Sequence, residues 1–363
     1  MTAPDAPPEA AAPRPPRHMR WRAPDSLRTI ATVLVGAAAG WYLMLQLAPV
    51  LRPLLIAAFL AYVLMPYHSR LRRHIGTPAS LTVLAGSTAA VLVVLGLVTY
   101  ASILALNDDV PRLQQRAGEL TDQAERAVAA HAPWAMPADD GKPTQARANE
   151  QIGRVIRPVL TVAADAALEA CVVALYLLFL LLEGSRFPDR VRKAYPPARA
   201  DEILKVAGGV SEAIISYLRA KVKSSLFLAI PVGLVLWVVG VKFALLWVVL
   251  TFLCNFIPYI GTVVSYTLPV GFGFLWFGPS WEAFAAAGLL LVCHAASASV
   301  AEPMIIGSAV GISPLVILGS LAFWGLLWGI PGMFLAVPLT VIAILVMDHF
   351  DQTRALAKLL KGG

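Results

Sequence analysis

The chain has 363 residues, of which 58% are hydrophobic and only 14% are charged, and its mean hydropathy is +0.71. Ordinary soluble domains are about half apolar and about a quarter charged, so a soluble fold of this size would lack the charges to cover its surface. The composition therefore excludes a typical cytosolic enzyme and a disordered protein, and it fits a protein that crosses a membrane several times. We interpret the net charge of +7 as an excess of Lys and Arg in cytoplasmic loops, so no nucleic-acid partner is expected.

The cysteines and short motifs point away from disulfide, metal and catalytic chemistry. Cys171, Cys254 and Cys293 lie in separate apolar runs, where a free cysteine behaves as a small buried hydrophobe. The sequence contains no Cys-x-x-Cys, no His-Glu-x-x-His, no nucleotide-binding glycine loop and no nucleophile elbow. We therefore expect no metal, no cofactor and no enzymatic activity.

Residues 1–26 are predicted to form a disordered tail. Seven prolines in this stretch prevent a regular helix, and four arginines make it basic. The apolar run that follows, 27–47, is too long for the core of a signal peptide, and no small-residue cleavage site comes after it. We therefore interpret 27–47 as the first membrane span.

Apolar runs recur along the rest of the chain. About 20 apolar residues in a helix cross a hydrocarbon core about 30 Å thick. The runs have the approximate bounds 27–47, 53–67, 79–106, 158–182, 225–241, 244–277, 283–300 and 314–347. The sixth and the eighth are longer than one crossing and are interrupted by Pro or Gly. The expected fold is an all-α polytopic membrane protein with about eight transmembrane helices and broken or re-entrant segments in its C-terminal half.

The charges of the connecting segments predict the orientation of the chain. Lys and Arg dominate 1–26, 68–75, 183–224 and 348–363, whereas 107–157 has nearly balanced charges. Eight spans place the four basic segments on one side, which the positive-inside rule makes cytoplasmic. The predicted order is a cytoplasmic tail (1–26), spans one to three (27–106), an extracytoplasmic segment and loop (107–157), span four (158–182), a cytoplasmic segment (183–224), spans five to eight (225–347) and a cytoplasmic tail (348–363).

Two of the polar segments have the spacing of amphipathic helices. Apolar residues recur at helical intervals in 107–130 and again in 201–224. Such helices could lie on the membrane surface, pack against a neighbouring subunit, or pack on loops of the same chain. The sequence leaves these three alternatives open.

The first Gly/Pro break interrupts the sixth apolar run. Its residues read Asn-Phe-Ile-Pro-Tyr-Ile-Gly over 255–261, and Asn255, Pro258, Tyr259 and Gly261 are the candidates for a binding site. Proline removes a backbone donor, and the polar backbone groups freed by a break inside the bilayer are tolerated only next to protein or a water-filled cavity. Transporters use such broken helices to bind substrates. The alternative is a simple kink, or a tight turn between two short helices.

Two further breaks follow in the C-terminal third. The second spans 302–314 and contributes the candidates Glu302, Pro303, Gly307 and Pro314, and the third contributes Pro331 and Gly332. We expect that no helix runs straight through Pro331-Gly332 and Pro338, so that a re-entrant hairpin or two half-helices result. Two separate short helices near the membrane surface are the alternative. If the breaks meet near the membrane midplane, they line a transport site.

Four strings, taken in order, resemble the AI-2E family of bacterial transporters, also called the PerM-type permeases. They are Phe-Ile-Pro-Tyr-Ile-Gly (256–261), Glu-Pro-Met-Ile-Ile-Gly (302–307), Ile-Ser-Pro-Leu-Val-Ile (312–317) and Gly-Ile-Pro-Gly-Met-Phe-Leu-Ala-Val-Pro (329–338). The resemblance covers nearly the whole chain after residue 27. It implies a bacterial inner-membrane transporter that forms pentamers and binds its ligand near re-entrant elements. It also implies export of a small molecule such as autoinducer-2, or sodium/proton exchange.

Ionisable residues within the apolar runs are candidates for an ion relay. Asp165 and Glu169 lie four residues apart, on one face of the predicted fourth span. A carboxylate inside the bilayer is costly, so it should face a cavity or a partner. The alternatives are that the span begins later, leaving Asp165 in the interface, or that the pair faces a wet subunit contact. His294 is a third relay candidate, and its alternative role is that of a hydrogen-bonded core residue.

The leading functional hypothesis is an exporter of a small polar solute or signalling molecule, embedded in the bilayer with both termini in the cytoplasm and assembled as a homo-oligomer. A sodium or other cation/proton antiporter that uses Asp165, Glu169 or Glu302 is the first alternative. A membrane scaffold without cargo is the second.

Overall fold

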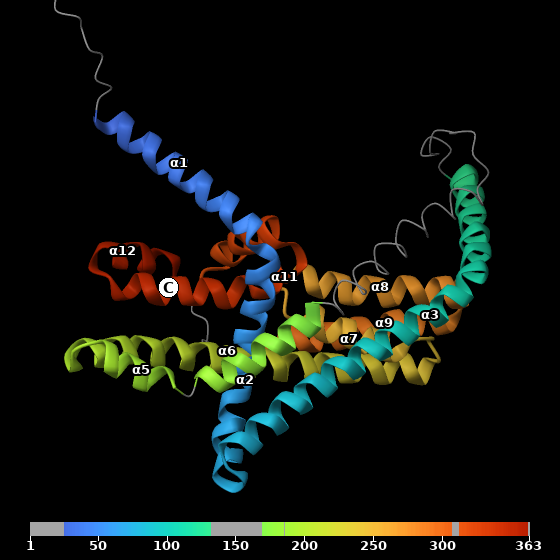
Figure 1. Ribbon diagram of the computed structural model, residues 1–363. Helices are drawn as coiled ribbons and strands as arrows, with labels where there is room; N and C mark the ends of the chain where they lie inside the picture. Colours follow the sequence, from blue (N-terminus) through green and yellow to red (C-terminus); the bar gives the residue numbers. More distant parts are fainter. Residues whose placement is uncertain (1–24, 132–168, 185, 307–311, 362–363) are drawn as a thin grey trace, which may run out of the picture. The chain divides into compact units, whose positions relative to one another are not determined.

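The computed structural model describes residues 25–131, 169–184, 186–306 and 312–361, and nearly all of them are helical. Figure 1 shows the helices along the chain. They are α1 (Asp25–Gln46), α2 (Ala48–Ile75), α3 (Thr77–His131), α5 (Phe187–Ala194), α6 (Pro197–Val239), α7 (Ala244–Cys254), α8 (Ile260–Phe277), α9 (Trp281–Ala296), the π-helix η2 (Ser297–Ala301), α10 (Glu302–Ile306), α11 (Pro314–His349) and α12 (Asp351–Leu360). A further helical segment, Glu169–Gly184, precedes α5.

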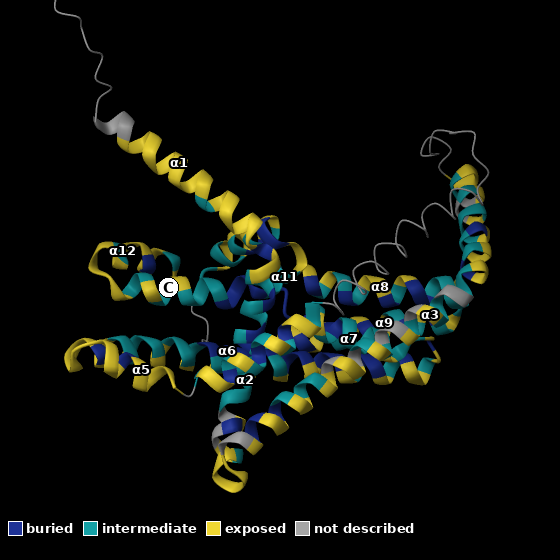
Figure 2. Ribbon diagram, viewed as in Figure 1, coloured by how far each residue is buried: buried dark blue, intermediate teal, exposed yellow. Residues whose placement is uncertain are grey.

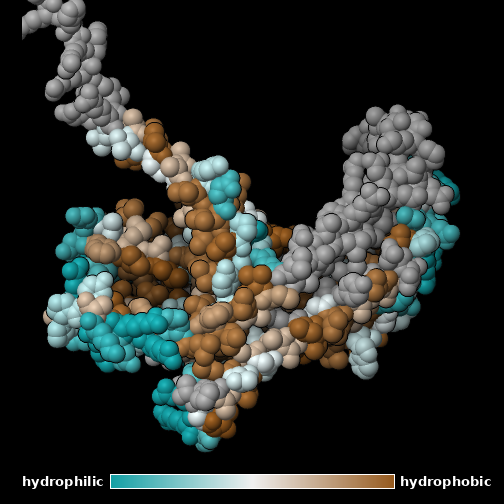
Figure 3. Space-filling model, viewed as in Figure 1, coloured by the Kyte–Doolittle hydropathy of each residue, from teal (hydrophilic) through white to brown (hydrophobic). Residues whose placement is uncertain are grey.

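Seven helices within the described residues are long and apolar enough to cross a membrane. An eighth is added if Glu169–Gly184 and α5, which meet at a bend of 54°, count as one span. Figure 3 shows hydrophobic atoms over much of the visible surface of α2 and α3, and hydrophilic atoms at α5. The predicted all-α polytopic fold is thus confirmed. The predicted tail up to residue 24, the outer loop 132–157 and Asp165 lie outside the described residues.

The chain divides into two compact units, Met1–Gln46 and Leu47–Gly363. The described part of the first unit is α1, whose 22 residues span about 33 Å at 1.5 Å per residue. Its apolar side chains are exposed along most of the helix, as the yellow ribbon of Figure 2 shows. A helix of that length with an apolar surface on all sides fits a membrane span.

Each of the two predicted amphipathic segments continues a neighbouring span as one helix. The 55 residues of α3 contain the third apolar run and 107–130, and the 43 residues of α6 contain 201–224 and the fifth run. Leu113 on α3 is buried among α6, α8 and α9, and Ile214 and Leu218 on α6 are buried against α2 and α11. The apolar stripes of both segments therefore pack on helices of their own chain.

α6, α7, α8 and α9 form the bundle that positions the candidate site. Leu228, Val232 and Leu236 on α6 are buried against Phe272 on α8 and Leu290 on α9. At the C-terminal end of α6, Lys242 forms an ion pair with Asp109 on α3. Arg112 on α3 lies over the ring of Trp276 on α8, 4.3 Å from its centroid. The end of α6, the end of α8 and the middle of α3 therefore lie at one end of this bundle.

α11 is a hairpin and not a straight helix. Gly329 has φ 67° and ψ −143°, a conformation that breaks the helix and that residues with a Cβ rarely adopt. A Cβ on Gly332 would lie 2.0 Å from the carbonyl oxygen of Trp324, eight residues earlier. Residues eight apart in a straight helix are separated by about 12 Å, so the two arms must fold back on each other. The predicted break in this run is confirmed.

The position of that break differs from the prediction. The chain turns at Gly329, and Pro331 falls in the first turn of the second arm, where a missing amide donor costs little. The expectation that Pro338 also stops the helix was wrong. The second arm continues through the buried Pro338 to His349, because the packing of this arm outweighs the loss of one backbone hydrogen bond.

The predicted C-terminal tail contains a helix that holds both ends of α11. The backbone amide of Ser313, just before α11, donates to the carbonyl of Leu360 on α12 at 3.2 Å. The Lys361 ammonium, just after α12, pairs with the Asp348 carboxylate near the end of α11 at 2.9 Å. His349 in turn lies 3.3 Å from Glu202, near the start of α6. The two ends of the α11 hairpin, which we call its feet, therefore lie at the end of the bundle opposite Lys242.

Candidate functional site

The first predicted break is a tight chain reversal between α7 and α8. α7 ends at Cys254, and its 11 residues cover only about 16 Å, which is about half of a hydrocarbon core. Tyr259 has φ 62°, and a Cβ on Gly261 would lie 1.7 Å from the carbonyl oxygen of Cys254. Only glycine fits this approach. Of the two structural alternatives, 255–261 thus adopts the tight turn.

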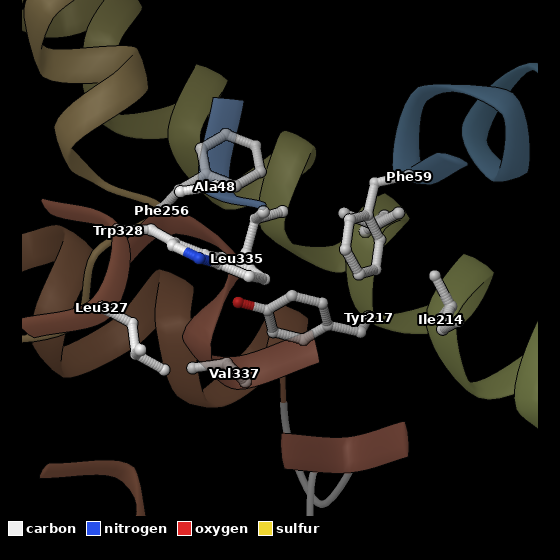
Figure 4. Packing of buried hydrophobic residues seen from close by; sticks show 10 residues of the cluster. Ala48, Phe59, Ile214, Tyr217, Phe256, Leu327, Trp328, Leu335 and Val337 are labelled. Atoms are coloured by element: carbon white, nitrogen blue, oxygen red, sulfur yellow. The ribbon is translucent and has the colours of Figure 1, made fainter. Parts of the chain in front are cut away.

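This turn packs against the hairpin of α11. Phe256 stacks on Phe334, with ring centroids 4.6 Å apart and an interplanar angle of 23°. Ile257 shares a buried cluster with Leu321 and Ala336, one residue from each arm of the hairpin. Figure 4 shows the larger cluster around Phe256, in which α2 and α6 also take part. The structure thus brings together two breaks that are far apart in the sequence.

A row of polar side chains on α6 faces this junction. Tyr217, Lys221 and Ser225 follow one another at intervals of four, so they share one face of the helix, and all three are buried. The Asn255 amide nitrogen, at the end of α7, donates to the Ser225 hydroxyl at 3.0 Å, and Asn255 is itself buried. The predicted site residue Asn255 therefore joins the first break to the polar face of α6.

Lys221 and Glu302 form an ion pair inside the protein. The ammonium Nζ of Lys221 lies 3.4 Å from the Glu302 Oε1, and the side chains are 5% and 36% exposed, respectively. A buried ammonium without a charged partner is strongly disfavoured, so this carboxylate stabilises Lys221 in its charged form. Glu302 stands where the π-helix η2 meets α10. Such π-helical turns occur frequently at functional sites.

Several buried hydroxyls near these residues have no hydrogen-bond partner among the described residues. They are the hydroxyls of Tyr217 and Ser224 on α6 and of Thr251 on α7. Figure 4 shows the Tyr217 hydroxyl directed toward Leu335 and Trp328 of the hairpin. An unsatisfied buried polar group costs about 1–3 kcal/mol, so these groups are suited to a polar ligand or to water.

A groove of about 840 Å³ runs along α6 beside the ion pair. Its walls include Ala220, next to Lys221 in sequence, and Met304 and Ile305, which closely follow Glu302. The charged residues Glu212, Arg219 and Lys223 also line it. The groove is large enough for a small molecule, and α10, which begins with Glu302, forms one of its walls.

The other predicted site residues occupy varied positions. Pro258, Tyr259 and Gly261 build the α7–α8 turn, and Tyr259 is 51% exposed. Pro314 begins α11 at the foot of the hairpin, whereas Pro331 and Gly332 lie just after its tip. Pro303 is part of the short helix α10, and Gly307 lies outside the described residues. Glu169 is the first residue of the described segment before α5 and is half-buried.

His294 is fully hydrogen-bonded within the bundle. Its Nδ1 lies 2.9 Å from the carbonyl oxygen of Leu290, and its Nε2 lies 3.0 Å from the Ser265 hydroxyl. Because a carbonyl only accepts, the Nδ1 must carry a proton. The Nε2 of the neutral imidazole can then accept the single hydroxyl hydrogen of Ser265, for which the Thr262 carbonyl, 3.1 Å from the same oxygen, is the competing acceptor. This arrangement matches the alternative role of a bonded core histidine. Its use as a relay stays a prediction.

Sequence reasoning missed Lys221, Tyr217 and Ser225. The sequence prediction treats Lys221 as one of the bases of the cytoplasmic segment 183–224, because it separates this segment from the span that follows. A signal was present: polar residues recur every four positions, from Tyr217 into the apolar run that begins at Ser225. Within the described residues, no group of three or more His, Cys, Asp or Glu side chains could hold a metal ion.

Comparison with known proteins agrees with this architecture. The sequence model described as "AI-2E family transporter" matches residues 30–352, nearly the whole chain. The chain belongs to the AI-2E transporter family. It is similar to YhhT of Escherichia coli K12, with 28% identity over 342 residues, which are 93% of each chain. It is also similar to the AI-2 transport protein TqsA of the same strain, with 31% identity over 202 residues, which are 56% of this chain and 58% of TqsA.

A third AI-2E relative, PerM of Escherichia coli K12, is 26% identical over 320 residues, which cover 85% of this chain and 90% of PerM. The resemblance found in the four Gly/Pro strings is thus confirmed. Membership establishes a multi-pass membrane protein of a bacterial transporter family. It assigns no cargo to the ion pair or to the polar face of α6.

Proposed function

We propose that this AI-2E family member exports a small polar solute or signalling molecule across the bacterial inner membrane and acts as a transporter, not as an enzyme. The cargo site lies where the α7–α8 turn meets the α11 hairpin. The observation that carries the proposal is the contact of Phe256 with Phe334 beside the buried polar residues Lys221, Ser225 and Asn255. Autoinducer-2 appears in the name of the relative TqsA, and we extend to this chain only the class of small polar cargo.

The two hairpins enter the protein from opposite ends. The α7–α8 pair has its feet at Lys242 and Trp276, at the C-terminal end of α6. The α11 hairpin has its feet at Ser313 and His349, and His349 lies next to the start of α6. Freed backbone groups at such tips are tolerated inside a bilayer where protein or a polar cavity covers them. Two tips that meet beside α6 form a barrier that a small displacement of either one could open.

The charge pattern supports both termini in the cytoplasm. If 183–224 is cytoplasmic, the feet of the α11 hairpin share that side, and the Lys242 end of α6 is extracytoplasmic together with the middle of α3. In this arrangement α7–α8 is re-entrant from outside, and α11 is re-entrant from inside. Two re-entrant elements replace two of the eight predicted crossings without changing the side of the C-terminus. We retain the homo-oligomer, a pentamer by family resemblance, as part of the proposal.

Transport by the purified protein in liposomes tests this function. We expect exchange of radiolabelled small polar metabolites between the lumen and the medium, and a loss of about tenfold in Ser225→Ala, since the Asn255 donor is then left unpaired. Ser87→Ala is the matched control, because Ser87 bonds only its own helix, at the Leu84 carbonyl. Flux driven only by opposed sodium and proton gradients would instead establish the antiporter. No flux of any solute or ion would refute transport and leave the scaffold.

A further inference from the structure

Lys221 is a buried cation with unused hydrogen-bonding capacity around it. Its side chain is 5% exposed, and among the described residues its one charged partner is Glu302, at 3.4 Å. An ammonium has three donors, and this long contact uses one of them. Its neighbours on the same helix are the unpaired hydroxyls of Tyr217 and Ser224. The unused N–H donors of Lys221 and these two hydroxyls, which can each donate one hydrogen, are therefore available to an anionic group.

Glu302 differs from Lys221 in its access to water. Its side chain is 36% exposed, and the residues that follow it, Met304 and Ile305, line the groove along α6. Water can therefore deliver a proton to Glu302, whereas the Lys221 ammonium is buried. The same groove holds the bases Arg219 and Lys223 and the acid Glu212, so its charged lining carries a net positive charge that favours anions near α6.

From this geometry we infer that the Lys221–Glu302 pair is a proton-controlled binding site for the anionic group of the cargo, a carboxylate or a phosphate. The inference rests on the proposed transport function and names the class of its cargo. A proton that adds to the Glu302 carboxylate gives a neutral acid and breaks the ion pair. The Lys221 ammonium then binds the anionic group, and the Tyr217 and Ser224 hydroxyls donate to its oxygens.

The balance of charge makes proton and anion bind together. In the resting site, Lys221 (+1) and Glu302 (−1) sum to zero. After one proton and one monoanion have bound, the ammonium, the neutral acid and the anion again sum to zero. A charged intermediate would be expensive in this buried position, so the two events are coupled. Export then runs down the concentration gradient of the cargo, and each anion carries one proton outward.

Other titratable groups on the elements packed around the pair do not explain such coupling. Glu212, Arg219 and Lys223 line the groove but are exposed on α6, so a change of their charge is screened by water. Tyr217 lies within electrostatic range of Glu302 but is neutral as a phenol at physiological pH. His294 on the neighbouring α9 has both ring nitrogens occupied within the bundle. Arg52 on α2 donates to the Ala48 carbonyl of its own helix. The described part of η2 carries no ionisable side chain.

Binding of simple anions to the purified full-length protein in lipid nanodiscs tests the inference. The probes are acetate, lactate and inorganic phosphate, with lactamide as the neutral counterpart of lactate. We expect at least one anion to bind with uptake of about one proton, measured with a pH indicator dye in weakly buffered solution. Its Kd should fall about tenfold for each unit by which the pH is lowered while Glu302 is ionised. Lactamide should neither bind nor change the pH.

Variants separate the role of Glu302, which takes up the proton, from that of Lys221, which binds the anion. In Glu302→Gln the anion should bind with a pH-independent Kd and no proton uptake, and in Lys221→Met binding should be lost. Lys221→Arg keeps the charge and should keep binding, which guards against misfolding of the methionine variant. Lys205→Gln, an exposed change on the same helix, is the matched control and should behave as wild type.

The outcomes distinguish this site from the proposed function. If no anion binds with proton uptake, or if Glu302→Gln retains the pH dependence, the inference is overturned. If liposomes export neutral polar solutes while anions fail to bind, the transport function stands and the anion site falls. If anions bind with proton uptake but no solute crosses the liposome membrane, the site stands and the export proposal fails.

Discussion

Gly332→Ala tests whether the α11 hairpin is folded as the structure has it. A Cβ at this position would lie 2.0 Å from the Trp324 carbonyl oxygen, 2.8 Å from the Trp324 carbonyl carbon and 3.0 Å from the Trp328 Cβ. Real contacts of a Cβ are longer than 3.0 Å, so the two arms would have to separate by at least about 1 Å. The nearest atom belongs to the backbone, so a change of side-chain rotamer cannot relieve the clash.

The loss of stability in Gly332→Ala can be compared with the effect of the same substitution at a matched glycine of α11. Gly319 lies in the first arm with nothing within 4 Å of its Cβ position, so Gly319→Ala should gain about 1 kcal/mol from helix propensity. Gly332→Ala should lose about 3 kcal/mol, the upper end for overpacking, since both arms must move. The two substitutions add the same methyl group to one helix, yet their effects should differ by about 4 kcal/mol.

Thermal unfolding of the protein in detergent measures this difference. At about 2.1 cal/mol/K of unfolding entropy per residue, 1 kcal/mol shifts the unfolding temperature of a 363-residue chain by about 1.3 °C, so Gly332→Ala should unfold about 5 °C below Gly319→Ala. The variant should still insert into the membrane, because its apolar content is unchanged, but its transport should fall. Equal unfolding temperatures for the two variants would mean that Trp324 and Gly332 do not approach each other, and would remove the hairpin from the proposed site.

Two further predictions concern the side that we propose to be cytoplasmic. Burial, and to a lesser degree the charge of Arg72, lowers the pKa of His68, which lies on α2 beyond its apolar span. Below about pH 6.5 the unfolded chain therefore binds more protons than the folded chain, so the free energy of unfolding should decrease as the pH falls. Urea titrations at several pH values measure this dependence, and His68→Gln should make it weaker. Lys361→Ala removes the ion pair with the partly exposed Asp348, so hydrogen exchange in the first turn of α11 should accelerate. The increase should be less than about fivefold, because such pairs contribute under about 1 kcal/mol. Unchanged exchange would show that α12 does not hold the hairpin.

The backbone of the site could be predicted because proline and glycine act locally. Pro258 and Pro331 cannot donate an amide hydrogen bond wherever they stand, so a break near each was foreseeable. The exact residue at which the helix breaks was not foreseeable. Gly325, Gly329 and Gly332 all lie within one stretch of eight residues, and the sequence does not show which of them takes a positive φ. That choice depends on how the two arms pack, and the structure places it at Gly329.

The chemistry of the site was less accessible because it depends on contacts between distant residues. Lys221 and Glu302 are 81 positions apart, and nothing in either local sequence indicates the other. Lys221 looked like one more cytoplasmic base because the helix that carries it continues without a break from water into the bilayer. His294 illustrates the converse. It stood out as a lone ionisable group in an apolar run, yet Leu290 and Ser265 satisfy both of its nitrogens.

The depth of the ion pair indicates which barrier has to open for export. Lys221 precedes the end of α6 at Val239 by 18 residues, or about 27 Å, so it lies near the cytoplasmic boundary of a core about 30 Å thick in the proposed orientation. The groove follows α6 on that side as far as Lys223 and Met304, whereas the outward path is filled by Leu228, Val232 and other buried residues of the α6–α9 bundle. Loading from the cytoplasm then needs little motion, and release requires the α7–α8 pair to move relative to α6. The Asn255–Ser225 hydrogen bond joins those two elements at the level of the cargo, so its rupture is the step that the Ser225→Ala flux measurement probes.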